Sequence, residues 1–106
     1  MLRGWFYFRR TTSGNLVGEY SNNFINPRRS FTHTGDLIGI SNDFQGTYNS
    51  TWLEQNVPVI ALLTITNVGN NIFELRWEVV NNGPVFIGNA SVEGDLLIGE
   101  YSMIQI

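Results

Sequence analysis

The only possible imidazole base in this chain is its single histidine, His33, which is followed three residues later by Asp36. An imidazole beside a carboxylate can serve as a general base. Here the pair flanks Gly35 in a turn-like stretch, so we predict that His33 and Asp36 stabilise a turn. The chain has no cysteine, and one histidine cannot build a multi-histidine metal site. We therefore expect no metal and no cofactor, and an enzyme using His33 with a carboxylate ranks last among our hypotheses.

The charged residues argue against nucleic acid as a partner. The net charge is −3, and all six cationic side chains are arginines, whereas nucleic-acid binders carry a basic patch. Arg28 and Arg29 lie in the irregular stretch from Asn22 to Ser30. If that stretch covers a ligand, these two arginines and His33 are candidate contacts for an anionic group. The alternative is that the arginines face solvent or pair with carboxylates.

Aromatic residues with polar tips are the main lead to binding chemistry. Such side chains often line ligand cavities, and they also form ordinary cores. Both interpretations stay open for this sequence. The residues that we expect nearest to a ligand are Tyr20, Tyr48, Ser50, Trp52 and Trp77.

Hydrophobic periodicity predicts strands and no helix. In Phe73–Val79, apolar and charged residues alternate strictly, which predicts one buried face and one exposed face. Phe44–Trp52 alternates in the same way, and Val59–Asn67 is apolar on at least one face. Turn signals rich in Gly and Asn recur along the chain, including Thr34–Asp36, Val68–Asn71 and Asn81–Pro84. The sequence therefore predicts a single all-β domain over residues 1–106.

A repeated motif places glycine between two large residues. It reads Leu-x-Gly-x-Tyr at 16–20 and 97–101, and Phe-x-Gly-x-Tyr at 44–48. Glycine inside a strand costs stability, but it allows a sheet to bend and coil. We therefore predict an antiparallel up-and-down meander barrel of about eight strands. A β-sandwich is the alternative.

Two of these segments, 14–20 and 44–50, resemble strands of the avidin and streptavidin family, whose Gly-x-Leu-x-Gly-x-Tyr-x-Ser run they partly match. The resemblance implies an eight-stranded up-and-down barrel that binds biotin and forms dimers or tetramers. By position it implies that Tyr48 and Ser50 touch the ligand. Asn22 stands where the earlier run would carry serine. At the level of the fold, the chain resembles lipocalin-like barrels equally well. A fold alone does not define a function.

Two functional hypotheses lead. The first is non-catalytic binding of a small, partly apolar ligand at one mouth of the barrel. The second is a self-associating structural or protein-interaction module, a dimer or larger, because Trp5–Phe8 and Val59–Ile65 carry apolar residues on both faces. No run reaches the length of a membrane-spanning helix, and Met1–Arg10 does not have the pattern of a signal peptide. We therefore expect a cytoplasmic protein without a membrane partner.

Overall fold

A computed structural model describes residues 1–26 and 29–104 and places eight β-strands in them. None of these residues forms a helix, and so none belongs to a helix that is long and apolar enough to span a membrane. The strands are β1 (Arg3–Arg10), β2 (Leu16–Asn22), β3 (Phe31–Ile38), β4 (Gly46–Glu54), β5 (Val57–Gly69), β6 (Ile72–Val79), β7 (Val85–Glu93) and β8 (Leu96–Ile104).

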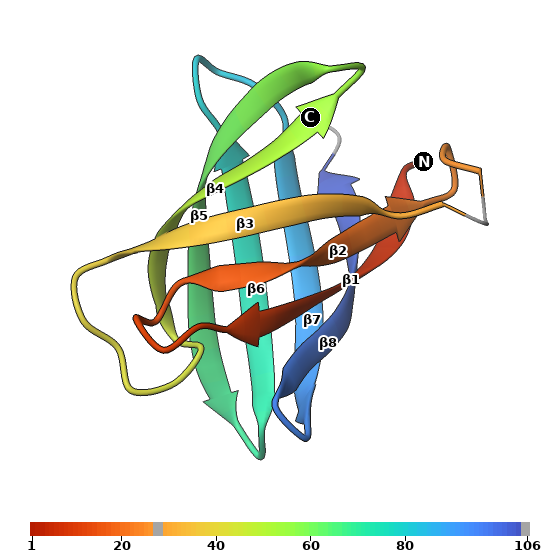
Figure 1. Cartoon of the computed structure of the whole chain (residues 1–106). Coiled ribbons are helices and arrows are strands. Elements are labelled where there is room, and N and C mark those ends of the chain that lie inside the picture. Colours follow the sequence, from red (N-terminus) through yellow and green to blue (C-terminus); the bar gives the residue numbers. More distant parts are fainter. Residues whose placement is uncertain (27–28, 105–106) are drawn as a thin grey trace.

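The strands form a closed meander barrel. Each strand pairs antiparallel with the next in the sequence, and β8 pairs with β1 to complete the circle (Figure 1). Closure removes both sheet edges, so every strand has a partner on each side. The predicted eight-stranded barrel is therefore confirmed, and the sandwich alternative is excluded.

Asparagine-rich turns connect the strands at several hairpins. Asn70 and Asn71 between β5 and β6 both have positive φ, and so do Asn81 and Asn82 between β6 and β7. Positive φ at both central residues defines the hairpin turn whose twist matches that of the strands, and asparagine tolerates it well. The sequence analysis predicted both turns, but it did not single out the equivalent Gln55-Asn56 turn between β4 and β5.

One predicted turn was wrong. Thr34, Gly35 and Asp36 lie inside β3, where they pair with Thr51, Ser50 and Asn49 of β4. His33 points into the barrel and Asp36 is exposed, so the two side chains do not stabilise a turn together. Gly35 is a strand glycine whose neighbours are the side chains of Leu16 and Tyr48. A Gly between short polar residues resembles a turn in sequence, and here the pairing with β4 overrides that local signal.

Inward-facing glycines let the strands coil tightly. A Cβ on Gly18 would overlap the carbonyl oxygen of Tyr7, and one on Gly99 would overlap that of Asn89. Aromatic rings cover the space that the missing side chains leave. Gly18 pairs with both Phe8 and His33, and these two rings stack with centroids 4.0 Å apart. The repeat is thus part of the barrel architecture, as predicted.

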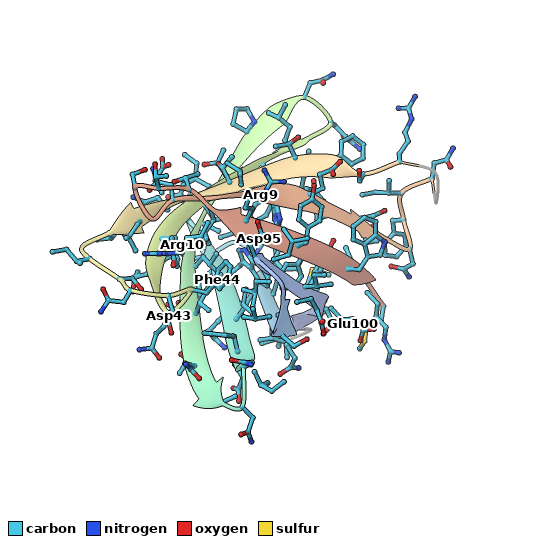
Figure 2. All side chains as sticks on the ribbon, turned by 60° about the horizontal axis from the view of Figure 1, so that its bottom comes forward. Arg9, Arg10, Asp43, Phe44, Asp95 and Glu100 are labelled. Atoms are coloured by element: carbon cyan, nitrogen blue, oxygen red, sulfur yellow. The ribbon has the colours of Figure 1, made fainter. Side chains whose placement is uncertain are left out.

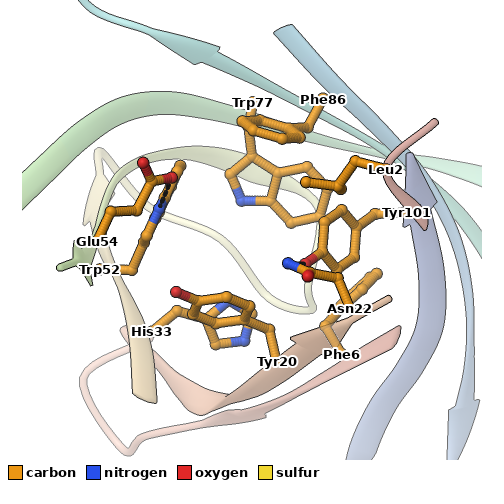
Figure 3. Close-up of a pocket in the computed structure, with 10 residues that line it drawn as sticks. All are labelled: Leu2, Phe6, Tyr20, Asn22, His33, Trp52, Glu54, Trp77, Phe86 and Tyr101. Carbon is orange, nitrogen blue, oxygen red and sulfur yellow. Dashed lines mark hydrogen bonds between the residues drawn. The ribbon is translucent and has the colours of Figure 1, made fainter. Parts of the chain in front are cut away.

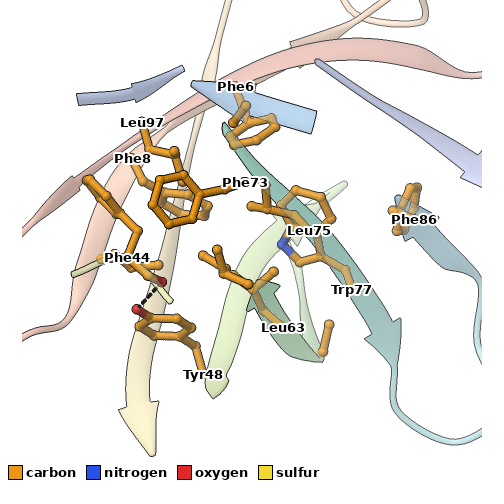
Figure 4. Packing of buried hydrophobic residues seen from close by; sticks show 14 of the residues in the cluster. Phe6, Phe8, Phe44, Tyr48, Leu63, Phe73, Leu75, Trp77, Phe86 and Leu97 are labelled. Atoms are coloured by element: carbon orange, nitrogen blue, oxygen red, sulfur yellow. Dashed lines mark hydrogen bonds between the residues drawn. The ribbon is translucent and has the colours of Figure 1, made fainter. Parts of the chain in front are cut away.

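The core fills one end of the barrel. Phe8, Leu97, Leu63 and Tyr48 are fully buried there, and Phe44 joins them from the loop before β4 (Figure 4). The Tyr48 hydroxyl donates to the Phe44 carbonyl oxygen at 2.7 Å.

Arg10 holds the loop that carries Phe44. Its guanidinium donates a hydrogen bond to the carbonyl oxygen of Ser41. Figure 2 shows Arg10 beside this loop, near Asp43 and Phe44. The contact helps to close this end of the barrel, and the opposite end is where a site can form.

Candidate functional site

An aromatic pocket lies at the opposite end of the barrel, where β2, β4 and β8 end and β1 begins (Figure 3). Its free volume is about 50 Å³. Because a cavity needs at least about 10–15 Å³ to hold one water molecule, which takes up about 30 Å³ in the liquid, the pocket admits only a small group. Its lining residues are Leu2, Phe6, Tyr20, Asn22, His33, Trp52, Glu54, Trp77, Phe86 and Tyr101.

Four aromatic rings form a closed circuit around the pocket, namely Tyr20, Trp52, Phe86 and Tyr101. Successive ring centroids are 6.0 to 6.5 Å apart, and successive ring planes meet at 69° to 80°. Trp77 packs against Tyr101 with centroids 6.1 Å apart. Near-perpendicular rings arranged in this way resemble the walls of a box, and Figure 3 shows them around a central space.

Hydrogen bonds fix the rings at the mouth. The Trp52 indole Nε1 donates to Glu54 Oε1 at 3.0 Å, and Asn22 Nδ2 donates to the Tyr101 hydroxyl at 3.0 Å. The Tyr20 hydroxyl donates to the Leu53 carbonyl oxygen at 3.3 Å. The last two of these bonds link β2 to β8 and to β4 across the opening. The walls are therefore held in place before any ligand arrives, which reduces the entropy cost of binding.

His33 contributes a neutral imidazole to the deeper part of the pocket. It is buried, and its Nε2 lies 3.0 Å from the Tyr7 carbonyl oxygen, to which it donates. Burial lowers the pKa of His33 to about 4, although the Tyr7 carbonyl and the charge of Glu19 oppose this shift. No carboxylate in the described part of the chain forms a hydrogen bond with His33. At neutral pH the ring is thus uncharged, and it carries no positive charge for an anion.

Four of the predicted site residues meet in the pocket, namely Tyr20, Trp52, Trp77 and His33. Tyr48 and Ser50 do not line it. Along β4 the inward side chains are Tyr48, Ser50, Trp52 and Glu54, in order from the filled end to the mouth. Tyr48 and Ser50 are fully buried below the pocket, so the positions implied by the avidin resemblance lie in the filled part of the barrel.

Ser50 has a buried hydroxyl group without a hydrogen-bond partner among the described residues. Burying an unpaired hydroxyl costs free energy. We therefore expect Ser50→Ala to raise the free energy of unfolding by about 1 kcal/mol, measured by urea denaturation. A decrease of similar size would contradict this expectation and would show that the hydroxyl is satisfied.

Of the two predicted arginine contacts, Arg29 does not line the pocket. Arg29 is exposed, and its backbone nitrogen donates to the Asn26 carbonyl at 2.8 Å. Arg28 lies outside the described residues. His33 is therefore the only one of the three predicted anion contacts that lines the pocket in the described part of the chain.

Sequence reasoning missed several lining residues, including Asn22, Glu54, Phe86 and Tyr101. Two signals were available in the sequence. Tyr101 occupies the same position of the glycine motif as Tyr20. Glu54 follows Trp52 by two residues, and in a strand this spacing puts both side chains on the same face. Alternation alone could not show that both positions lie at the open end.

Comparisons with known proteins identify no relative of this chain. No family model, curated protein or solved structure matches this chain. Function must therefore be argued from the pocket itself.

Proposed function

We propose that this protein is a non-catalytic binding protein that holds a small, partly apolar ligand in the aromatic pocket. The observation that carries the proposal is the closed circuit of Tyr20, Trp52, Phe86 and Tyr101 at an open barrel mouth. Ligand sites are concave and mostly apolar, with a few polar groups that orient the ligand. Here Asn22, Glu54 and Tyr101 supply those groups.

The volume of the pocket limits what enters. About 50 Å³ is far below the several hundred Å³ that enclose a drug-sized molecule. We therefore infer that a small apolar or partly apolar head inserts between the rings, while the rest of the ligand lies at the mouth. The buried rings of Trp52 and Trp77 line the inserted head from two strands.

Tryptophan fluorescence tests the proposal directly, because Trp52 and Trp77 both line the pocket. A library of small neutral and charged fragments would be screened by the change in emission, with NMR shift mapping of each hit. Shifts should cluster on pocket residues and vanish in Trp52→Ala, provided that this variant keeps the barrel's circular dichroism spectrum. Tyr48→Phe, a change in the filled end, should bind like the unchanged protein. Hits that map elsewhere, or no hits at all, would overturn the proposal.

Self-association is the second candidate, and an exposed apolar patch on the outside of the barrel favours it. Leu53 and Pro58 face each other across β4 and β5, and Ile60 and Leu62 continue the row along β5. The backbone nitrogen of Val80 donates to the Ile60 carbonyl, which brings Val80 alongside. We call these five residues the outer apolar patch. Contiguous exposed apolar surface often marks an interface, and a second copy of this chain is the occupant that we propose.

Light scattering coupled to size exclusion, over a series of concentrations, measures this association. We expect a dimer or larger assembly for the unchanged protein and a monomer for Ile60→Glu. Ile98→Glu is the matched control, because Ile98 is similarly exposed but lies on β8. A monomer at all concentrations, or equal effects of the two substitutions, would refute self-association through the patch.

A further inference from the structure

The charge around the aromatic pocket has one sign. Glu54 is the only charged side chain that lines it in the described part of the chain, because His33 is neutral and donates to the Tyr7 carbonyl. Glu54 Oε1 accepts from Trp52, and Oε2 has no hydrogen-bond partner among the described residues. The chain contains no lysine, and Arg29 is exposed outside the pocket. The pocket thus presents one carboxylate and no described cation.

The aromatic walls of the pocket also favour a cationic ligand. The faces of Trp and Tyr rings carry partial negative charge, and they attract a cation within about 6 Å of the ring centroid. In the circuit of Tyr20, Trp52, Phe86 and Tyr101, successive centroids are no more than 6.5 Å apart. A group between the rings can therefore contact several of them at once. The negative charge of Glu54 also raises the pKa of Tyr20 and of Tyr101, although burial is the larger cause for both.

Size and polarity narrow the ligand further. The pocket admits only a small group, and a nitrogen with three methyl groups is compact, with four heavy atoms. The deeper part of the pocket is lined by Phe6, Trp77 and His33, and the only acceptor that these side chains offer is His33 Nδ1, because Nε2 donates to the Tyr7 carbonyl. A primary ammonium has three N–H donors, so most of them would stay unpaired there. A methylated ammonium needs few acceptors, because most or all of its hydrogens are replaced by apolar methyl groups.

We infer that the aromatic pocket binds an organic cation, in the form of a methylated ammonium group held between the rings with Glu54 at the rim. This inference rests on the proposed function and specifies its ligand class. It also differs from the sequence-based suggestion that Arg28, Arg29 and His33 could contact an anionic group of the ligand. The methyl groups would contact the rings, and the carboxylate of Glu54 would balance the charge.

The test compares choline with 3,3-dimethylbutan-1-ol, which replaces the nitrogen by carbon and removes the charge without changing the shape. Binding is followed by tryptophan fluorescence and by NMR at low ionic strength. We expect choline to bind about tenfold more tightly than the neutral alcohol, because cation–π attraction is strengthened in a desolvated site. Tetramethylammonium chloride, used as a second probe, should compete with choline, whereas sodium chloride at the same concentration should compete only weakly.

Matched variants separate the contribution of the Glu54 carboxylate to choline binding from that of the aromatic rings. Glu54→Gln should weaken choline binding about threefold at low salt and leave the neutral alcohol unaffected. Glu74→Gln removes an exposed carboxylate on the outer face of β6 and should change nothing. Tyr20→Leu should weaken choline binding about fivefold, whereas Tyr20→Phe keeps the ring and should bind nearly as well.

The outcomes distinguish this inference from the proposed function. Equal or tighter binding of the neutral alcohol in the pocket would overturn the inference that the ligand is a cation. It would leave the proposed binding site in place. No binding of choline or tetramethylammonium would also overturn it, while neutral hits from the fragment screen would uphold the broader proposal. Failure of every fragment would overturn both.

Discussion

Acidification from pH 7 to pH 4 is expected to lower the free energy of unfolding of this barrel by about 3 kcal/mol through His33 alone. Burial lowers the pKa of His33 from 6.5 to about 4 in the folded chain. Between these values the unfolded chain binds the proton and the folded chain does not, so stability decreases as the pH falls. The loss begins near pH 6.5 and continues until the folded imidazole itself takes up a proton near pH 4.

Urea denaturation at intervals between pH 7 and pH 4 measures this effect, and His33→Gln is its control. Glutamine cannot titrate, and its amide can still donate to the Tyr7 carbonyl, so the variant should show a flatter dependence on pH. The half-buried Glu19 is a separate contributor, because hydrogen bonds from Ser30 and Tyr7 lower its pKa. Its hydrogen bonds are present in both proteins, so their effect cancels in the comparison, and only the smallest cause of the shift, the charge of His33, is lost in the variant. Identical pH profiles, or an NMR titration of His33 near pH 6.5, would disprove the prediction.

Gly18→Ala is expected to cost more than about 2 kcal/mol of unfolding free energy, because it forces a methyl group against the backbone of β1. The new Cβ would overlap the Tyr7 carbonyl oxygen and lie 2.8 Å from the Tyr7 carbonyl carbon and 3.1 Å from Phe8 Cα. Backbone atoms in a closed barrel cannot move away as a flexible side chain can. The same carbonyl accepts the hydrogen bond from His33, so that contact should be disturbed as well.

Gly35→Ala is the matched control, since Gly35 also lies inside a strand. Its Cβ would meet only side-chain atoms, at 3.3 Å from Leu16 Cδ1 and 3.4 Å from Tyr48 Cβ. Replacing glycine also lowers the conformational entropy of the unfolded chain, which stabilises the folded state by about 0.5–1 kcal/mol. We therefore expect a change within about 1 kcal/mol, measured by the same urea titration. Equal losses for the two variants would show that contact with the β1 backbone does not set the cost.

Local rules predicted much of the fold. Alternation in Phe73–Val79 identified the buried face of β6, where Phe73, Leu75 and Trp77 are all buried. The asparagine pairs identified tight hairpins, because few residues tolerate positive φ at two successive positions. The glycine repeat indicated strong coiling, which favours a barrel over a flat sandwich. Thr34–Asp36 was misread because its turn-like composition is also compatible with a paired strand.

The candidate site was predicted only in part. Tyr20, Trp52 and Trp77 were identified as pocket residues from their chemistry, and the structure places them together. Tyr48 and Ser50 carry equally suitable groups on the same face of β4 as Trp52, yet they lie in the filled end. Nothing in the local pattern of β4 distinguishes the two halves of the strand.

The sequence by itself determined which side chains face inward, several of the tight turns and how strongly the sheet must coil. These properties follow from the two-residue period of a strand and from the backbone preferences of glycine and asparagine. Only the tertiary structure decided which end stays open and which residues meet there. The height of a side chain in a barrel depends on the register of all eight strands around the closed circle. The pairing of β8 with β1 brings Tyr101 beside Phe6 and completes the aromatic box, through contacts between residues far apart in the chain.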